Sequence, residues 1–325
     1  MLDKFYPLIQ LLADGKFHSG ETLSKHFSIS RTAIWKQIKQ LDGTAGINIQ
    51  AVTGRGYRLE SNFDLLQKSL LLEGVDPGSS GCLDMLQILS ETASTNDYLR
   101  AQPAPSPGRG LACFAEYQSA GRGRRGKTWV SGFGRNIILS LSWSFDIPLS
   151  QLSGLSIALG TAVAETLVNL GLNGICLKWP NDLHVAGRKL GGILVEASGE
   201  LDGPSLAVIG IGVNVSSVLS ADIDQPWTAL DKEMSELPAR NILAGKLLNA
   251  LVESCKQYSN TGLAPFLHRW DGFDCYRGRQ IRLITAAGEV TGCCFGVDQT
   301  GGLIIESSGQ RKVFHAGEVS LRLQE

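Results

Sequence analysis

The sequence predicts a multidomain α/β (α+β) protein that begins with a helix-turn-helix head. Its 325 residues exceed one ordinary domain of about 100–200 residues. Hydrophobic residues make up 43% and charged residues 19% of the chain, so it can bury a core, which excludes a disordered or fibrous protein. Apolar residues at helical spacing near the N-terminus give way to strand patterns with many glycines. We therefore expect a small helical head followed by a body that contains β-sheet.

Cysteine, histidine and membrane signals exclude several classes of protein. The seven cysteines are an odd number without a C-x-x-C pair, which predicts reduced thiols rather than a disulfide framework or a zinc knuckle. The five histidines are scattered and show no metal-binding spacing. The N-terminus lacks the apolar block of a signal peptide, and the uncharged stretch 147–164 predicts a buried helix rather than a membrane span. We expect a soluble cytoplasmic protein with no membrane partner.

The first 41 residues fit short helices and a tight turn. Ser19 is the expected N-cap of a helix that carries Leu23 and Phe27 on one face. After a three-residue turn, Ser30 is the expected N-cap of a second helix. Its inward residues follow the spacing i, i+4, i+7 and are Ile34, Ile38 and Leu41. Two helices joined by a tight turn, the second with a polar outer face, are typical of a helix-turn-helix.

Residues 47–59 alternate around a glycine-rich turn and predict a β-hairpin, the wing of a winged helix, with Arg55 at its tip. Residues 1–60 hold eight Lys or Arg against five acids, an excess that fits nucleic acid. The side chains expected to contact DNA are Ser30, Arg31, Thr32, Trp35, Lys36 and Arg55. The alternative is a protein-docking module with a solvated basic face. Because one head offers few base contacts, a dimer on two half-sites is expected.

An arginine-rich loop is the strongest sign of a ligand site. The run Gly121-Arg122-Gly123-Arg124-Arg125-Gly126 is followed by Lys127, and no acid occurs from residue 117 to residue 145. Glycines let the backbone approach a ligand closely, and guanidinium groups suit a polyphosphate or an acyl phosphate. The pattern is neither a Walker loop nor a dinucleotide fingerprint. The alternatives are a solvated basic loop and a second contact with nucleic acid.

Three other segments could meet at the same site. Lys178-Trp179-Pro180-Asn181-Asp182 follows an apolar strand and ends in a turn, and residues 187–192 open another strand, so together they predict a β-hairpin. Residues 207–215 predict a central strand whose glycines allow a ligand or another backbone nearby. Ser94-Thr95-Asn96 could bind a polar ligand head, or Ser94 or Thr95 could cap a helix that follows, and both can hold.

These motifs, in this order, resemble the biotin–protein ligases. The S-T-N triplet, the G-R-G-R-R-G loop, the K-W-P-N-D run and Gly187-Arg188-Lys189-Leu190 all occur there, and the winged helix in front is that of the bifunctional bacterial form, which is also the biotin operon repressor. The resemblance covers essentially the whole chain. It implies a winged helix-turn-helix at 1–63, a catalytic domain with a class II synthetase-like mixed sheet and helices at 64–271, and an SH3-like small barrel at 272–325.

The resemblance also implies a two-step reaction. Biotin and ATP, both substrates, condense to biotinyl-5′-AMP, and biotin then passes to a lysine of the biotin carboxyl carrier protein of acetyl-CoA carboxylase. The implied biotin-binding residues are Ser94, Thr95, Asn96, Gln118, Arg122, Gly123, Arg124 and Lys189. The implied adenylate- or ATP-binding residues are Arg124, Trp129, Asn181, Asn214 and Trp227.

Catalysis is assigned by the same resemblance to Lys189, Arg122 and Asp182. The two cations would stabilise the charge where the biotin carboxylate meets the α-phosphate. Asp182 would act as base or positioner for the attacking lysine. Mg²⁺ is implied by the ATP chemistry, although the sequence shows no cluster of metal ligands.

Regulation is implied as well. Biotinyl-5′-AMP would act as corepressor, and the adenylate-bound homodimer, paired near Val195–Ser198, would bind biotin operator DNA. Three alternatives remain. A biotin-sensing repressor without catalysis is disfavoured by Arg122, Arg124 and Lys189. A lipoate ligase is disfavoured by the K-W-P-N-D run together with the arginine-rich loop and the fused head. The third is a ligase whose head no longer binds DNA.

Overall fold

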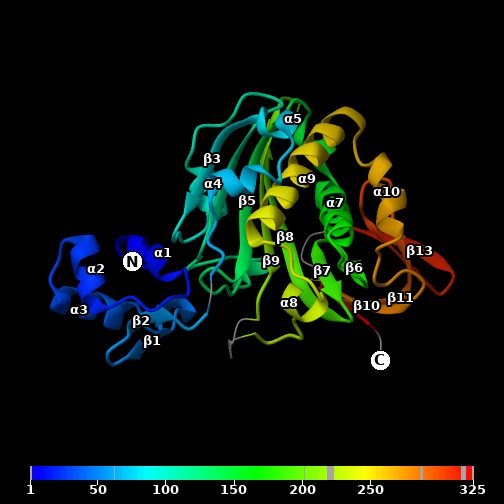
Figure 1. Cartoon of the computed structure of the whole chain (residues 1–325). Coiled ribbons are helices and arrows are strands. Elements are labelled where there is room, and N and C mark those ends of the chain that lie inside the picture. Colours follow the sequence, from blue (N-terminus) through cyan, green and yellow to red (C-terminus); the bar gives the residue numbers. More distant parts are fainter. Residues whose placement is uncertain are drawn as a thin grey trace.

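The computed structural model describes residues 2–61, 63–200, 202–217, 223–285, 288–315 and 320–323. Figure 1 shows a small helical head at the N-terminal end, a large central sheet flanked by helices, and a smaller sheet formed by the C-terminal part of the chain. The predicted α/β (α+β) organisation is therefore confirmed. The final residues of the expected C-terminal barrel, 324 and 325, lie outside the described residues.

The head is a helix-turn-helix followed by a β-hairpin. Its elements are η1 Leu2–Phe5, α1 Tyr6–Leu12, α2 Gly20–Phe27, α3 Arg31–Leu41, η2 Thr44–Gly46, β1 Ile49–Val52 and β2 Gly56–Leu59. Both predicted N-caps are confirmed, since Ser19 Oγ accepts from the Thr22 N–H at 3.0 Å and Ser30 Oγ accepts from the Ala33 N–H at 3.1 Å. The predicted wing is the antiparallel pair of β1 and β2.

The central sheet has seven strands in the order β3-β4-β5-β9-β8-β7-β6. They are β3 Leu83–Leu89, β4 Gly110–Ala115, β5 Asn136–Phe145, β6 Ile175–Lys178, β7 Asp182–Val185, β8 Arg188–Gly199 and β9 Ser205–Asn214. Only β3 and β4 among these pairs run parallel, so the sheet is mixed, as predicted. The glycine-containing strand expected at 207–215 is β9, which lies in the middle of the sheet.

Helices cover both faces of this sheet. They are α4 Lys68–Leu72, α5 Pro77–Ser80, α6 Thr95–Arg100, α7 Leu155–Asn169, α8 Leu230–Glu233, α9 Arg240–Thr261 and α10 Ala264–Asp271, with short 3-10 turns η3 Arg124–Gly126 and η4 Leu149–Leu152. Figure 1 shows α7 and α9 side by side against the sheet, where they enclose the main hydrophobic core. The shorter α6 contacts β4, β5 and β9.

One apolar segment passes the length and composition test for a membrane span. Among the described residues it is Leu149–Asn169, and 61% of its most apolar stretch is buried inside the fold. The predicted buried helix is α7, which begins at Leu155 rather than at residue 147. A buried core helix has the same length and composition, and the burial of α7 favours that interpretation.

The hairpin predicted around the K-W-P-N-D run needs a correction. We expected one hairpin with its second strand opening at residues 187–192, but Asp182–Val185 forms the separate strand β7. The reason is the turn at Ala186 and Gly187, whose φ angles of 48° and 76° reverse the chain sharply between β7 and β8. Asp182 therefore starts a strand of the sheet instead of ending a loop.

The C-terminal part folds as a five-stranded antiparallel sheet in the order β13-β12-β11-β10-β14. Its strands are β10 Gln280–Thr285, β11 Gly288–Val297, β12 Leu303–Ser307, β13 Gln310–Phe314 and β14 Ser320–Leu323. This sheet occupies the position where the small barrel was predicted. Trp179 ties it to the central domain, because its indole N–H donates to the Gly301 carbonyl at 2.9 Å.

The prediction that all cysteines are reduced is wrong for one pair. Cys176 and Cys275 form a disulfide across 99 residues, with their Cα atoms 5.2 Å apart. The backbone aligns them, since the Leu177 N–H donates to the Phe273 carbonyl at 2.6 Å and the Cys275 N–H donates to the Leu177 carbonyl at 3.0 Å. The spacing of the cysteines in the sequence does not indicate this tertiary contact. The other cysteines, at 82, 113, 255, 293 and 294, are free thiols.

The head and the central domain share a hydrophobic cluster. Phe133, which follows the arginine-rich loop, is fully buried among apolar residues of the head. Its ring meets those of Tyr6 and Phe63 edge to face, with centroids 6.5 and 5.7 Å away. Its N–H donates to the Ala45 carbonyl at 3.0 Å. The segment that leads from the loop into β5 is thus anchored in the head.

Candidate ligand site

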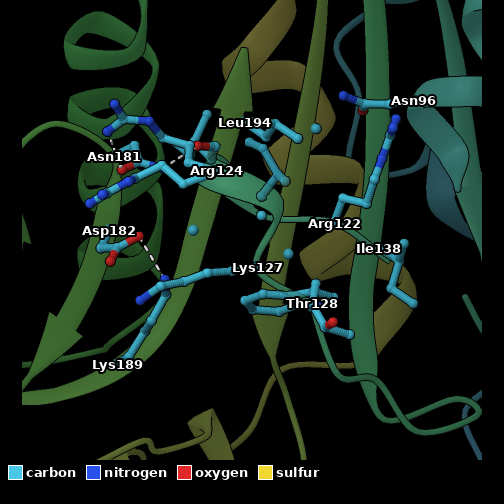
Figure 2. Close-up of a pocket in the computed structure, with 18 of the residues that line it drawn as sticks. Asn96, Arg122, Arg124, Lys127, Thr128, Ile138, Asn181, Asp182, Lys189 and Leu194 are labelled. Carbon is cyan, nitrogen blue, oxygen red and sulfur yellow. Dashed lines mark hydrogen bonds and ion pairs between the residues drawn. The ribbon is translucent and has the colours of Figure 1, made fainter. Parts of the chain in front are cut away.

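The predicted site residues converge on one pocket above the central sheet (Figure 2). The pocket is lined by eleven of the residues singled out from the sequence: Ser94, Thr95, Asn96, Gln118, Arg122, Gly123, Arg124, Trp129, Asn181, Asp182 and Lys189. They come from α6, from the segment 118–129, and from the β7–β8 region. These eleven residues are up to 95 positions apart in the sequence, from Ser94 to Lys189.

One wall of the pocket is apolar. The apolar residues along it are Ile138, Leu139, Ile193, Leu194 and Ile211. The side chains of Leu139, Ile193 and Ile211 belong to the main core on the other face of the sheet, so Ile138 and Leu194 supply the apolar side chains of this wall. Glycines in β9 leave room there for side chains of the site. A Cβ on Gly210 would lie 2.5 Å from Asn96 Oδ1, and a Cβ on Gly212 would lie 2.5 Å from the Trp129 ring. Glycines were expected here to admit a ligand or another backbone, and the structure shows that they admit these two side chains.

A buried polar network forms one end of the pocket. Gln118 Oε1 accepts from both the N–H and the hydroxyl of Thr95, at 2.7 and 2.9 Å. The Ser140 hydroxyl lies 2.7 Å from Thr95 Oγ1 and 2.6 Å from Asn96 Oδ1. Ser94 caps α6 with a contact of 3.4 Å to the Asp97 N–H, so its capping alternative is confirmed. Sequence analysis missed Ser140, which sits in an ordinary apolar strand pattern.

A charged group lies at the opposite end of the pocket. Lys189 Nζ donates to Asp182 Oδ1 at 2.7 Å. Arg124 donates to Asn181 Oδ1 at 3.4 Å, and Asn181 Nδ2 donates to the Ile193 carbonyl at 2.6 Å. Burial lowers the pKa of Arg124, and the nearby Asp182 opposes that effect. Figure 2 shows these four side chains grouped on one side of the pocket, with Arg122 and Asn96 on the other.

The arginine loop, residues 121–129, is itself a folded turn. Its ends are joined because the Trp129 N–H donates to the Gly121 carbonyl at 2.9 Å and the Gly123 N–H donates to the Lys127 carbonyl at 2.7 Å. Arg125 takes a left-handed backbone with φ 59°. The guanidinium of Arg122 pairs with Asp97 at 2.5 Å. Asp97 was missed as a site residue because it appeared only as an acid in the first turn of a helix.

Two predicted residues, Asn214 and Trp227, are not among the residues that line the pocket. Asn214 accepts from Asn136 Nδ2 at 2.9 Å and donates to the Thr228 carbonyl at 2.9 Å. Trp227 lies under the ammonium of Lys232, 5.2 Å from its ring centroid. The segment around Trp227 supports Lys189, because the Lys189 N–H donates to the Pro226 carbonyl at 3.0 Å. Both residues therefore support the wall that carries Lys189.

His184 is a buried histidine that sequence analysis did not single out. It lies on β7, two residues after Asp182, and is 9% exposed. Burial lowers its pKa to about 4, with Asp182 opposing the shift and Lys178 and Lys189 adding to it. The imidazole is therefore neutral near pH 7 and adds no charge behind the pocket.

The predicted DNA-binding residues divide between a groove and its rim. Arg31, Thr32 and Trp35 line a groove between α3 and the wing. Trp35 is 46% exposed, while Ser30 serves as the N-cap of α3. Lys36 is also exposed on α3. The wing-tip residue Arg55 stacks over Phe17, with 4.2 Å to the ring centroid.

Three family models match separate parts of the chain. The HTH domain matches residues 6–58 and the biotin/lipoate A/B protein ligase family matches residues 89–214. The biotin protein ligase C terminal domain matches residues 276–322. The three matches follow the order of the head, the central sheet and the C-terminal sheet.

Individual proteins match over longer stretches. The bifunctional ligase/repressor BirA of Escherichia coli (strain K12) is 39% identical and covers 100% of both chains. The protein of the same name from Bacillus subtilis (strain 168) is 30% identical over 97% of each chain. A solved structure of biotin protein ligase from Aquifex aeolicus, in complex with biotin and ATP, aligns with a TM-score of 0.62 and 27% identity over 74% of this chain and 99% of that one.

Proposed function

Because the chain belongs to the family of bifunctional ligase/repressors that BirA represents, we propose that it is a biotin–protein ligase and a DNA-binding repressor in one polypeptide. The full-length match at 39% identity carries this conclusion. The pocket supports it, since it combines a polar end, an apolar wall and a cationic end. Biotin has the same three parts: a ureido ring, an aliphatic tail and a carboxylate.

The ureido ring belongs at the buried polar end. Thr95 and Gln118 offer both donors and acceptors there, and Asn96 is fixed beside them by Ser140. The thiophane ring and tail fit the apolar wall supplied by Ile138 and Leu194. In this orientation the carboxylate extends toward the other end of the pocket. Ser94 and Gly123 complete the lining of the biotin site.

The cationic end is where we place adenylation. Lys189 would neutralise charge where the biotin carboxylate attacks the α-phosphate of ATP, with Arg124 on the same side of the pocket and Arg122 reaching in from the other side of the arginine loop. A charge held in place before the reaction stabilises the transition state without reorganisation. Trp129 would shield the adenylate, Asn181 would border it, and Asn214 and Trp227 would act through the wall that they support.

Asp182 is the proposed positioner for the second step. A lysine of the carrier must lose a proton before it attacks the acyl phosphate. Asp182 is the only carboxylate that lines the pocket within the described part of the chain. Its partner Lys189 would turn to the phosphate when ligand arrives, leaving the carboxylate able to accept a hydrogen bond from the incoming amine. The acceptor proposed is the biotin carboxyl carrier protein of acetyl-CoA carboxylase.

Mg²⁺ would enter with the nucleotide. Proteins usually hold this ion with one or two carboxylates together with substrate phosphates. Across the described residues no group of three or more His, Cys, Asp or Glu is placed to hold a metal ion. Asp182 offers one carboxylate at the cationic end. One carboxylate thus fits a Mg²⁺ ion that is bound mainly by the phosphates of ATP. The ion would neutralise the charge of those phosphates.

Repression of transcription would depend on the N-terminal head and on one edge of the central sheet, that of β8. We propose that 1–63 binds biotin operator DNA, that 64–271 carries catalysis and that 272–325 assists it, in the cytoplasm. Contacts to DNA would come from Arg31, Thr32, Trp35 and Lys36 on α3, Arg55 on the wing and Ser30 at the helix N-terminus. Beyond Ile193, the β7-facing edge of β8 pairs with no strand in the part of the chain that the structure describes. An open edge suits pairing with a second copy when adenylate is bound.

Mass spectrometry tests the ligase function directly. The full-length protein is incubated with biotin, ATP and Mg²⁺, and the small molecules that it retains are identified after gel filtration. We expect biotinyl-5′-AMP with biotin, and modification of one lysine when carrier protein is added. Lipoate in place of biotin is the control. Activation of lipoate but not of biotin would overturn the assignment in favour of a lipoate ligase.

A further inference from the structure

An ion pair connects the two walls of the pocket, and it joins the proposed catalytic residue Arg122 to Asp97, which has no assigned role in the reaction. Asp97 follows directly after Asn96 on α6, and its Oδ1 lies 2.5 Å from the guanidinium of Arg122 on the arginine loop. Figure 2 shows the Arg122 side chain extending toward Asn96, away from Lys189. The pair therefore spans from the wall that holds the polar ligand head to the loop that covers the pocket.

Neighbouring charges keep both partners in place. Glu196 on β8 accepts from Asn96 Nδ2 at 2.7 Å and from Arg100 at 2.6 Å. It also lies 4.0 Å from Arg122, while Arg100 lies 3.8 Å from Asp97. Two carboxylates and two guanidinium groups thus form a closed cluster. Because the cluster includes the Asn96 amide, α6 and the arginine loop meet at a defined position.

The position of Arg122 in the arginine loop lets this ion pair hold the loop against α6. Arg122 stands at the start of the loop, where its backbone bridges to Thr128 near the end. Between them lie Arg124, Arg125 and Lys127, which repel one another in the absence of an anion. The nearest backbone contacts to the wall come just before the loop, from Ser119 and Ala120 to Thr92 and Ala93. Within the loop, the Arg122 side chain supplies the contact to α6.

We infer that Asp97 is a positioning residue that fastens the arginine loop to α6 and so sets how long biotinyl-adenylate stays in the pocket. The inference rests on the proposed ligase function. Asp97 touches no reacting atom in this assignment and acts through Arg122. Opening of the loop requires this ion pair to break, so weakening the pair raises the rate at which the adenylate escapes.

The expected effect is modest and depends on salt. The side chains of Arg122 and Asp97 are 43% and 46% exposed, so solvent screens their attraction. Exposed pairs of this kind change an equilibrium by about two- to fivefold. Exposed charges are also screened as ionic strength rises from about 0.05 M to about 0.5 M. Loss of the pair should therefore raise the release rate in low salt and make it less dependent on salt.

The test measures release of the intermediate from the full-length protein. Wild type and Asp97→Asn are loaded with labelled biotin and ATP, and loss of bound biotinyl-adenylate is followed after a chase with unlabelled biotin. We expect release to be about two- to fivefold faster for Asp97→Asn at low salt, with the rate of adenylate formation unchanged. Asp84→Asn is the matched control, because Asp84 and Arg109 form an ion pair of the same length and similar exposure elsewhere on the surface.

A double-mutant cycle separates positioning from general loss of charge. The Arg122→Gln variants are loaded with biotinyl-adenylate itself, because Arg122 is also assigned to its formation. In Arg122→Gln, the further change Asp97→Asn should add nothing to the release rate, since its partner is already gone. Equal release by wild type and Asp97→Asn, or an equal effect of Asp97→Asn with and without Arg122, would overturn the inference. Failure of the wild type to form biotinyl-adenylate would instead refute the proposed function. A thermal melt of each variant detects loss of folding.

Discussion

Lys189 and Asp182 stand on adjacent strands and share a hydrogen bond of 2.7 Å at the cationic end of the pocket. Their side chains are only 18% and 22% exposed, so both charges are largely withdrawn from bulk water. Each charge neutralises the other in this pair. A carboxylate or phosphate that enters must take over the ammonium, which would release Asp182 for a second partner.

The first prediction concerns Lys189. Lys189→Ala should lose adenylation activity by about 10²–10³-fold, because removing one preorganised donor from a charged transition state costs about 3–4 kcal/mol. Pyrophosphate release from biotin and ATP measures the rate. Lys256→Ala is the control, since that lysine also pairs with an acid, at 2.9 Å, but lies on the surface of α9. A variant that releases pyrophosphate at the wild-type rate would contradict the assignment.

The second prediction concerns Arg124. Arg124→Gly should release biotinyl-adenylate faster and biotinylate bystander proteins, because it removes a partly buried guanidinium from the loop over the pocket. A streptavidin blot of added bystander proteins measures the escape. Arg125→Gly is the matched control, since Arg125 is exposed and already has the left-handed backbone that glycine tolerates best. Equal labelling by the two variants would show that the guanidinium of Arg124 does not retain the intermediate.

Much of the fold follows from local patterns. The helix-turn-helix could be predicted because Ser19 and Ser30 are strong N-caps before amphipathic runs, and capping acts over three residues. The central strand β9 could be predicted because it is apolar and interrupted by glycines. Such patterns involve residues close together in the sequence, so they can be recognised without knowledge of the tertiary structure. The separate strand β7 was missed because its four residues are too short to show alternation.

The site shows the limit of local patterns more clearly. The ligand-binding motifs stood out because glycines and arginines cluster along the chain. Asp97, Ser140 and the disulfide of Cys176 with Cys275 did not, since each acts through a partner at least 25 positions away. Contacts of that kind depend on how strands and helices pack. They could not be assigned before the fold was known.

The third prediction concerns pH and stability. His184 has its pKa lowered to about 4 by burial, below the ordinary value of 6.5. As pH falls from about 6.5 toward 4, the unfolded chain binds a proton at this histidine that the folded protein refuses, so stability is lost over that window. The loss approaches about 3 kcal/mol at the acid end. Urea unfolding at several pH values should show a shallower acid loss for His184→Phe than for wild type; identical slopes would refute this.

The fourth prediction joins ligand binding to DNA binding. A single head has few base-reading side chains, among them Arg31, Trp35 and Arg55, so tight operator binding needs two heads. Adenylate can promote pairing only if it binds the dimer more tightly than the monomer. We therefore expect sedimentation to show a monomer without ligand and a dimer with biotin and ATP. Ser198→Lys should oppose pairing by placing a charge on the open edge of β8, while retaining adenylation.

The control for that variant is Asn173→Lys, which adds the same charge at an exposed position on another surface. It should dimerise and protect operator DNA as the wild type does. Carrier protein without biotin should compete with dimerisation if it needs the same face, so that abundant carrier keeps the protein monomeric and relieves repression. An adenylate-bound protein that stays monomeric at concentrations that still protect operator DNA would disprove the coupling, because one head would then suffice and the open edge of β8 would play no part in repression.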